Sequence, residues 1–249
     1  MLKFLINSIL GFFNYKILKS ISFNNSNFIL LNIKTNLIVK IKFNKHSKFL
    51  ARNEYDGYGW YLKTRKRVKN LKLINFFYFF GIQIEKINGK KVNYFSNFSN
   101  NQFYIKKFIN FYSIIWNPKK KILPAHGDLT FDNIIFCRND IEIIDWEFFK
   151  KKGEVYCYDL VYFFLSTIVL PSLLNNKIKN DEKKIKKVWT KIQKKIIDKN
   201  LKKKPINFII NKFEKDSHWN KFNKIFPKKF FLNKLSQNQL EYLKKILHT

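Results

Sequence analysis

The sequence contains few arginines, cysteines and acids, and these shortages exclude some classes of protein and some kinds of site. Only 4 of the 49 basic residues are arginine, and 17 acids leave a formal net charge of +32 over 249 residues. The two cysteines, Cys137 and Cys157, have no CxxC or Cys/His spacing, which excludes a disulfide framework and a zinc site built on them. Such sparse cysteine is typical of a reducing compartment, so a cytoplasmic location is expected.

Long hydrophobic runs are also missing. The longest central run, Leu160 to Leu170, is shorter than the ~20 residues that a helix needs to cross a bilayer. Pro171 follows it, so the pattern predicts a buried helix that ends there and no transmembrane segment. The N-terminal residues MLKFLINSILGFF lack a small-residue cleavage pattern, and we expect an amphipathic lead-in there rather than a signal peptide.

The surplus of lysine has two interpretations. Clustered positive charge favours a polyanionic partner, because lysines neutralise phosphates and release their counterions. The chain is also rich in Asn, Ile and Phe, which share A/T-rich codons with Lys, so much of the charge, including Lys119 to Lys121 and Lys150 to Lys152, is expected on a solvated surface. A nucleic-acid partner is therefore not expected, whereas peripheral contact with an anionic membrane stays open.

The first third of the chain has the spacing of strands around one helix. Apolar, β-branched runs at Phe28 to Ile33 and Leu37 to Phe43 flank Lys34-Thr35-Asn36, which predicts a hairpin. From Ser47 to about Leu62 the apolar residues recur at helical spacing. The other elements predicted in this part are strands at Phe76 to Phe80 and Ile82 to Ile87, followed by a turn at Asn88-Gly89.

The remainder of the chain is mainly helical in pattern. Asn93 to Asn101 is predicted as a linker, Phe103 to Trp116 as a helix, and the residues after Asp159 have helical spacing throughout. With 46% hydrophobic residues the chain can bury a substantial core. A β-rich beginning and a helical remainder predict an α+β fold in two parts.

The stretch HGDLTFDNIIF, residues 126 to 136, concentrates polar residues directly ahead of a predicted strand. Ile134 to Phe136 and Ile141 to Asp145 are predicted as strands around the turn Cys137 to Asp140. If that hairpin is centred on Asn139, Asn133 and Asp145 lie opposite each other. An amide oxygen and a carboxylate are ligands that Mg²⁺ accepts when it arrives on nucleotide phosphates.

Asp128 lies five residues before Asn133, close enough for its carboxylate to accept a proton from an attacking hydroxyl. The motifs HGDLTFDN and IIDWE resemble those of the aminoglycoside phosphotransferase and choline kinase-like family, which shares the protein-kinase fold. The resemblance implies Asp128 as the catalytic base, Asn133 and Asp145 as Mg²⁺ ligands, His126 as a brace for the loop, and ATP as the donor.

The resemblance also implies a two-lobed architecture. Residues 1–88 would form a small, β-rich N-terminal lobe that binds the nucleotide. Residues 89–249 would form a larger, mostly helical C-terminal lobe that carries catalysis and the acceptor. Between the lobes, the backbone from Glu85 to Ile87 would meet the adenine.

Glu54 shares a helical face with Leu50, Tyr58 and Tyr61, which predicts a buried carboxylate. Such a group is costly without a partner, so a nearby cation is expected. The family resemblance implies Lys40, which would hold the α- and β-phosphates. Lys42, on the same strand face, stays open as the alternative.

Two further segments carry roles that the resemblance implies. The loop Phe23 to Asn27 occupies the place of a phosphate-covering loop but has no glycine, and Asn25 and Ser26 are expected to supply its donors. Asp159, in the segment after the predicted metal aspartate, is expected to cap a helix or brace the catalytic loop.

The acceptor is expected to be a hydroxylated small molecule, neutral or anionic. From Leu160 to Thr249 there are 22 lysines against six acids, which argues against polycationic aminoglycosides. A sugar, a glycan precursor, an amino alcohol or a choline-like compound held by aromatic faces fits this balance. Two alternatives stay open: a catalytically weak or inactive kinase-fold binding module, and a basic protein that binds nucleic acid or an anionic membrane.

Overall fold

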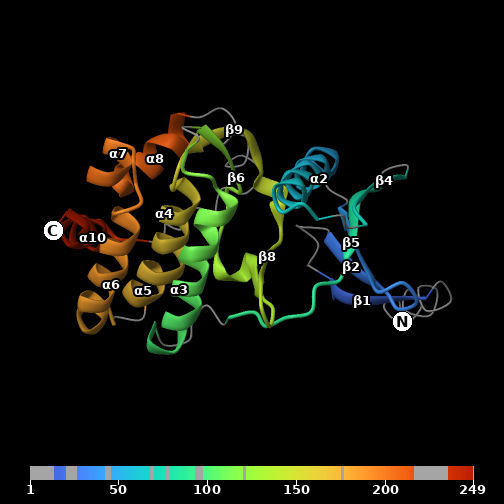
Figure 1. Cartoon of the computed structure of the whole chain (residues 1–249), viewed down its shortest axis with the longest axis horizontal. Coiled ribbons are helices and arrows are strands. Elements are labelled where there is room, and N and C mark those ends of the chain that lie inside the picture. Colours follow the sequence, from blue (N-terminus) through green and yellow to red (C-terminus); the bar gives the residue numbers. More distant parts are fainter. Residues whose placement is uncertain are drawn as a thin grey trace. The chain divides into compact units, whose positions relative to one another are not determined.

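The computed structural model describes residues 14–20, 27–42, 46–67, 70–76, 79–92, 98–119, 122–174, 177–215 and 235–248 (Figure 1). The chain divides into two compact units. The first combines Met1–Asn88 with Asp145–Phe149, and the second combines Gly89–Ile144 with Lys150–Thr249. The assignment of these units as a nucleotide-binding and an acceptor-binding lobe stays a prediction.

The first unit contains a five-stranded antiparallel sheet in the order β1-β2-β3-β5-β4. Its strands are β1 (Tyr15–Ser20), β2 (Asn27–Asn32), β3 (Leu37–Lys42), β4 (Lys72–Phe76) and β5 (Phe79–Glu85). The predicted hairpin is confirmed as β2 and β3, in which Asn32 pairs with Leu37. Strand β3 therefore lies inside the sheet, between β2 and β5.

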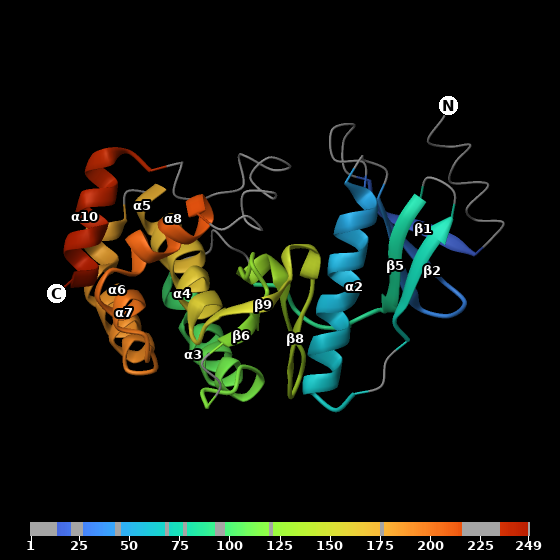
Figure 2. The same cartoon turned by 90° about the horizontal axis from the view of Figure 1, so that it is seen from above.

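Helix α2 (Ser47–Thr64) packs beside β5, as Figure 2 shows. Its apolar residues recur every three or four positions, so they form one buried face. Leu50, Ala51 and Tyr61 on this face are fully buried. The predicted helix is confirmed, and it extends two residues beyond the expected end.

The second unit is mainly helical and includes two small antiparallel sheets, β6 with β9 and β7 with β8. Its strands are β6 (Ile122–Ala125), β7 (Ile134–Phe136), β8 (Ile141–Ile143) and β9 (Lys150–Val155). Its helices are α3 (Phe98–Ile115), α4 (Tyr158–Phe164), α5 (Leu170–Leu174), α6 (Ile178–Gln193), α7 (Lys199–Lys203), α8 (Pro205–Lys215) and α10 (Gln237–His248). No helix in the described part of the chain is long and apolar enough to cross a membrane.

The apolar run that begins at Leu160 is a buried helix, but the helix does not end at Pro171. A π-helical turn, Leu165–Val169, connects α4 to α5, and Pro171 lies within α5. In that turn the N–H of Leu170 donates to the carbonyl of Leu165, five residues back. This wider turn accommodates a proline, which has no N–H to donate, without ending the helix.

Several predicted boundaries are wrong. The strand predicted across Phe76 to Phe80 is two strands, because β4 ends at Phe76 and β5 begins at Phe79. Within the predicted linker, α3 already begins at Phe98. Strands β1, β6 and β9 were not predicted. Of the run Lys150 to Lys152 in β9, which is expected on a solvated surface, Lys151 and Lys152 are exposed, as predicted. Lys150 is buried and its Nζ lies 2.5 Å from Oε1 of Glu154.

Candidate active site

Five charged side chains of the first unit form one network, which we call the charge cluster: Lys40, Lys42, Glu54, Asp145 and Glu147. Lys40 and Lys42 are two residues apart on β3, so they lie on the same face of the sheet. Lys40 Nζ donates to Glu54 Oε1 and, over 3.1 Å, to Asp145 Oδ1. Lys42 Nζ lies 2.8 Å from Glu147 Oε2 and 3.3 Å from Glu54 Oε2.

The expected partner of Glu54 is therefore not one lysine but two. Glu54 is completely buried, as its position on the helical face predicts, and each of its carboxylate oxygens lies beside a different lysine. The contact to Lys42 lacks hydrogen-bond geometry, which makes Lys40 the hydrogen-bonded partner and Lys42 an ion-pair partner.

Burial and charge set the protonation of these lysines. Burial by itself lowers the pKa of Lys40, but the carboxylates of Asp145 and Glu54 outweigh it and raise the pKa well above its ordinary value. The pKa of Lys42 is raised as well. Burial lowers it, but the carboxylates of Glu147 and Glu54 raise it by more. Both lysines therefore stay cationic at neutral pH.

The segment Asp145–Phe149 joins the first unit because its aromatic residues pack on α2. The ring of Trp146 is fully buried and lies 5.3 Å from that of Tyr61 between centroids. Asn53 of α2 donates from Nδ2 to the carbonyls of Glu147 and Phe149, over 2.8 and 2.7 Å. These contacts hold Asp145 beside Lys40.

Asp145 itself has a left-handed backbone, with φ 65° and ψ 58°. Asp is among the few residues other than glycine that adopt this conformation with some frequency, and local strain of this kind clusters at functional sites. Its side chain is 30% exposed, whereas Glu54 is completely buried. Asp145 is therefore the carboxylate of this cluster that a ligand can reach.

In the second unit, residues 126–133, which we call the catalytic-motif loop, are held by the carboxylate of Asp159. Its Oδ2 accepts from the N–H of His126 at 2.7 Å, and its Oδ1 accepts from the N–H of Gly127 at 3.0 Å. Gly127 has φ 88°, a conformation that side chains disfavour. Asp159 does not cap α4, because it is the second residue of that helix and Cys157 precedes the helix as its N-cap.

Burial raises the pKa of Asp159 to about 7, although the N–H groups of Gly127 and His126 act in the opposite direction. The carboxylate is 1% exposed. The attachment of the loop therefore depends on a group that titrates near neutral pH.

The ring of His126 is fully buried and bonded on both sides. Its Nδ1 accepts from the N–H of Asp128 at 3.3 Å, so its Nε2 carries the proton and donates to the carbonyl of Ile144 at 2.9 Å. This geometry agrees with the expected role of a brace for the loop.

Asp128 and Asn133 are connected through the loop backbone. Asn133 Nδ2 donates to the carbonyl of Asp128 at 2.6 Å, which turns the amide oxygen of Asn133 toward other partners. One carboxylate oxygen of Asp128, Oδ1, accepts from the hydroxyl of Tyr162 at 3.1 Å. The contact of Tyr162, on α4, with Asp128 was not predicted, because only the fold brings the two residues, 34 positions apart, within reach of each other.

The predicted register of the β7–β8 hairpin is wrong by one residue. Ile134 pairs with Ile143, and the N–H of Ile144 donates to the carbonyl of Asn133 at 2.9 Å. The residue opposite Asn133 is therefore Ile144, and Asp145 follows it. The predicted turn, Cys137 to Asp140, is confirmed, because the Cys137 N–H donates to the carbonyl of Asp140. A turn of four residues has its centre between Arg138 and Asn139 rather than at Asn139, which shifts the register by one residue.

The chemical types of the two predicted metal ligands suit a magnesium ion. Asn133 offers an amide oxygen and Asp145 a partly exposed carboxylate, and Mg²⁺ prefers such hard oxygen ligands. With all five groups ionised, the charge cluster carries two positive and three negative charges, so a cation at Asp145 would offset its surplus negative charge. Among the described residues, no group of three or more His, Cys, Asp and Glu side chains has an arrangement that could hold a metal by itself.

Of the four remaining predicted site residues, two lie in the first unit and two lie outside the described residues. Glu85 ends β5 and accepts from the backbone N–H and the side chain of Asn70, at 3.4 and 3.3 Å. Ile87 follows in an irregular segment and is itself half-buried between the exposed Lys86 and Asn88. Asn25 and Ser26 lie outside the described residues. The roles of these four residues stay predictions.

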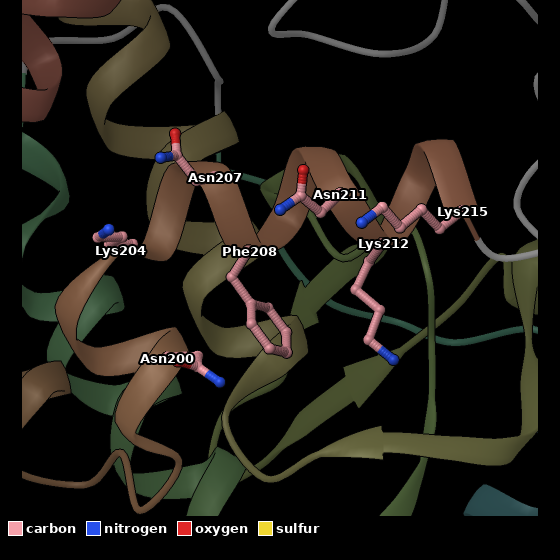
Figure 3. Close-up of a pocket in the computed structure, with 7 residues that line it drawn as sticks. All are labelled: Asn200, Lys204, Asn207, Phe208, Asn211, Lys212 and Lys215. Carbon is pink, nitrogen blue, oxygen red and sulfur yellow. The ribbon is translucent and has the colours of Figure 1, made fainter.

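A pocket of about 460 Å³ lies on α7 and α8 in the second unit (Figure 3). The residues that line it in the described chain are three asparagines, three lysines and a phenylalanine: Asn200, Lys204, Asn207, Phe208, Asn211, Lys212 and Lys215. Lys212 Nζ also lies 3.2 Å from Oε2 of the buried Glu154, which connects α8 to β9. Strand β9 pairs with β6, the strand that leads into the catalytic-motif loop.

No protein-family model matches the chain, and no curated protein matches it either. Among solved structures, the chain is similar to the kinase PK-1 of the Cydia pomonella granulovirus, with 15% identity and a TM-score of 0.37. The match covers 61% of this chain and 60% of the viral kinase, so it spans less than two thirds of that protein's length. Independently of this match, the predicted α+β fold class, with a β-rich N-terminal unit and a larger, mostly helical one, is confirmed.

Proposed function

We propose that the chain is a phosphotransferase that moves the γ-phosphoryl group of ATP to a hydroxyl of a small molecule, with Mg²⁺ as cofactor. The observation that carries this proposal is the position of Lys40, which is bonded at once to the buried Glu54 and to Asp145. The same chain carries the motif loop from His126 to Asn133. Membership of the aminoglycoside phosphotransferase and choline kinase-like family is part of the proposal.

Lys40 would bind the phosphates of the nucleotide. The neighbouring carboxylates keep its pKa high, so its ammonium group stays positive, and Glu54 fixes the direction in which it points. Because Glu54 is itself held by Lys42, the geometry does not depend on one contact. A charge-assisted hydrogen bond of this kind contributes about 1.5–3 kcal/mol.

Asn133 and Asp145 would supply oxygen ligands for the metal. When bound, Mg²⁺ neutralises charge on the phosphate oxygens. The bond from Asn133 Nδ2 to the carbonyl of Asp128 keeps the amide oxygen available for this role. The contact with Lys40 and the packing of Trp146 on α2 limit the movement of Asp145.

Asp128 would accept the proton of the acceptor hydroxyl as the phosphoryl group is transferred. The hydroxyl of Tyr162 and the backbone of the catalytic-motif loop orient its carboxylate. No covalent intermediate is required, because orientation of the reactants and neutralisation of charge account for phosphoryl transfer of this type.

The pocket on α7 and α8 supports the proposed acceptor class. Its asparagine amides can donate to and accept from hydroxyl groups, and its lysines favour an anionic group. No carboxylate is among the described residues that line it. A hydroxylated compound that is neutral or anionic fits these side chains better than a polycation does.

Calorimetric titration with ATP tests the nucleotide part of the proposal. We expect binding that requires Mg²⁺ and that is about 10- to 100-fold weaker in Lys40→Ala, which loses one charge-assisted contact. Lys16→Ala, at an exposed lysine of β1, is the matched control and should bind like the unmodified chain. Equal affinity in both variants would remove Lys40 from the nucleotide site.

Release of ADP across a panel of sugars, sugar phosphates, amino alcohols and choline tests the acceptor part. An acceptor found in this way should show a higher KM in the double variant Asn207→Ala and Asn211→Ala, while the KM for ATP stays unchanged. Asn180→Ala, at an exposed position of α6, serves as the control. An unchanged acceptor KM in the double variant would place the acceptor elsewhere.

A further inference from the structure

A second concave surface of the second unit lies between α3 and α6, away from the residues assigned above. Its volume is about 600 Å³. Twelve described residues line it, and six of them are lysines: Lys106, Lys184, Lys187, Lys191, Lys194 and Lys195. We call this surface the lysine groove.

The charge of the lysine groove has one sign. No Asp or Glu is among the described residues that line it. Lys106, Lys187, Lys191 and Lys194 are exposed, and within the described chain none of them lies within ion-pair distance of a carboxylate. Lys184, by contrast, has a carboxylate nearby, because its Nζ lies 3.9 Å from Oδ1 of Asp181. The four exposed lysines line one concave surface and have no carboxylate partner among the described residues, an arrangement that attracts an anion.

The floor of the groove is apolar. Ile105 and Ile109 of α3, which are both buried, and Val188 of α6 line it together with the lysines. Phe103 lines the groove as well and is 68% exposed. Ile114, 11 residues further along α3 and 75% exposed, falls within about 20° of Phe103 around the helix axis. One face of α3 thus presents two large apolar side chains to solvent, next to a cationic rim.

We propose that the lysine groove docks the chain on an anionic lipid bilayer, with Phe103 and Ile114 inserted among the acyl chains and the lysines against the headgroups. Helices that lie in a membrane interface combine these two features, an apolar face and a lysine-rich border. Each lysine near an anionic surface adds to the attraction, and the apolar residues add a component that salt does not screen.

The observations favour a bilayer over a polyanion in solution. A nucleic acid would be bound by the lysines alone and would leave the exposed Phe103 and Ile114 without a role. The basic side chains that line the groove are all lysine, and lysine is a point charge that lacks the forked geometry with which arginine recognises a particular phosphate. A surface rich in phosphate headgroups requires no such recognition.

Co-sedimentation of the full chain with vesicles tests this proposal. The vesicles contain phosphatidylcholine alone or with 30% phosphatidylglycerol by design, in buffer of roughly physiological ionic strength, at which charges are screened beyond about 8 Å. The groove variant is Lys187→Glu with Lys191→Glu. Its control, Lys202→Glu with Lys203→Glu, changes the net charge equally at exposed positions of α7 in the same unit. Phe103→Ser tests the apolar component without any change in charge.

We expect binding to the anionic vesicles only, at least ~10-fold weaker in the groove variant and roughly 3- to 10-fold weaker in Phe103→Ser, with the control unchanged. Equal loss in the groove variant and the control would show a response to net charge alone and would overturn the proposal. So would binding to neutral vesicles, absence of binding to anionic ones, or an unchanged affinity of Phe103→Ser. Because all the substituted positions are exposed, circular dichroism should show an unchanged fold.

Discussion

The charge cluster and the catalytic-motif loop hold their groups in place by different means. In the cluster, lysines and carboxylates are buried against each other, and Glu54 and Lys42 are almost completely inaccessible. In the loop, backbone N–H groups bond to one carboxylate, Asp159. The difference predicts which change should destabilise each region. The cluster should suffer from the loss of any charged partner, whereas the loop should respond to the protonation of a single acid.

The largest effect on stability is expected for Glu54→Ala. Removal of one partner from a buried ion pair costs about 3–5 kcal/mol, because the remaining charges are left buried without compensation. Here two lysines, Lys40 and Lys42, lose their shared partner. Urea denaturation of the full chain measures the free energy of unfolding.

Asp56→Ala is the control for that variant. Asp56 lies on the same helix, but its carboxylate is 40% exposed and its ion pair with Arg52 spans 3.3 Å at the surface. Such a pair contributes about 0–1 kcal/mol. Similar losses in the two variants would contradict a special role for the buried cluster.

The second prediction concerns pH. Because burial raises the pKa of Asp159 to about 7, the folded chain binds a proton more tightly there than the unfolded chain does. The contribution of this group to the free energy of unfolding is therefore greatest below about pH 4 and falls as pH rises to about 7, by on the order of 4 kcal/mol. Denaturation curves from pH 4 to 8 should show this decline.

In Asp159→Asn the decline should be smaller, because the titrating group is gone. Asp132→Asn, at an exposed position of the same loop, should keep the profile of the unmodified chain. If Asp159→Asn and the unmodified chain had parallel profiles, the carboxylate would not be the titrating group.

A smaller effect should separate two glycines of α2. A Cβ at Gly57 would lie 2.6 Å from Cβ of Trp146 and 2.9 Å from Cβ of Phe149, whereas a Cβ at Gly59 would meet nothing within 4 Å. Gly57→Ala should therefore cost about 1–3 kcal/mol through overpacking. Gly59→Ala should instead stabilise the helix by about 0.5–1 kcal/mol.

Thermal or urea unfolding of both glycine variants checks how closely the segment Asp145–Phe149 packs on α2. A Gly57→Ala variant as stable as the unmodified chain would mean that this packing is looser than the contacts of Trp146 indicate. Nucleotide affinity should fall with Gly57→Ala as well, because the same packing positions Asp145.

Periodicity predicted the parts of the fold that depend on local sequence. The hairpin of β2 and β3, helix α2 and the burial of Glu54 follow from alternation or helical spacing, and all are confirmed. Strands β6 and β9 could not be found in this way. The first contains Pro124 and the second three lysines, so their pairing is decided by tertiary contacts rather than by propensity.

The predicted chemistry of the site was incomplete for a related reason. Nothing in the sequence indicated that Lys42 bonds to Glu147, because 105 residues separate them and the pairing depends on Trp146 reaching α2. The hairpin register was wrong by one residue because the hairpin was assumed to be centred on Asn139, whereas its four-residue turn is centred between Arg138 and Asn139. The identity of Asp128, Asn133 and Asp145 as reactive residues rests on their motifs and stays a prediction.

The most direct test of the central claim is the rate of Mg²⁺-dependent ADP release by the unmodified chain and by Asp128→Asn, with the acceptor that stimulates release most. We predict a decrease of about 10²- to 10⁴-fold in kcat, because the general base is lost, with an unchanged melting temperature and unchanged ATP affinity. An Asp128→Asn variant that releases ADP as fast as the unmodified chain would contradict the account.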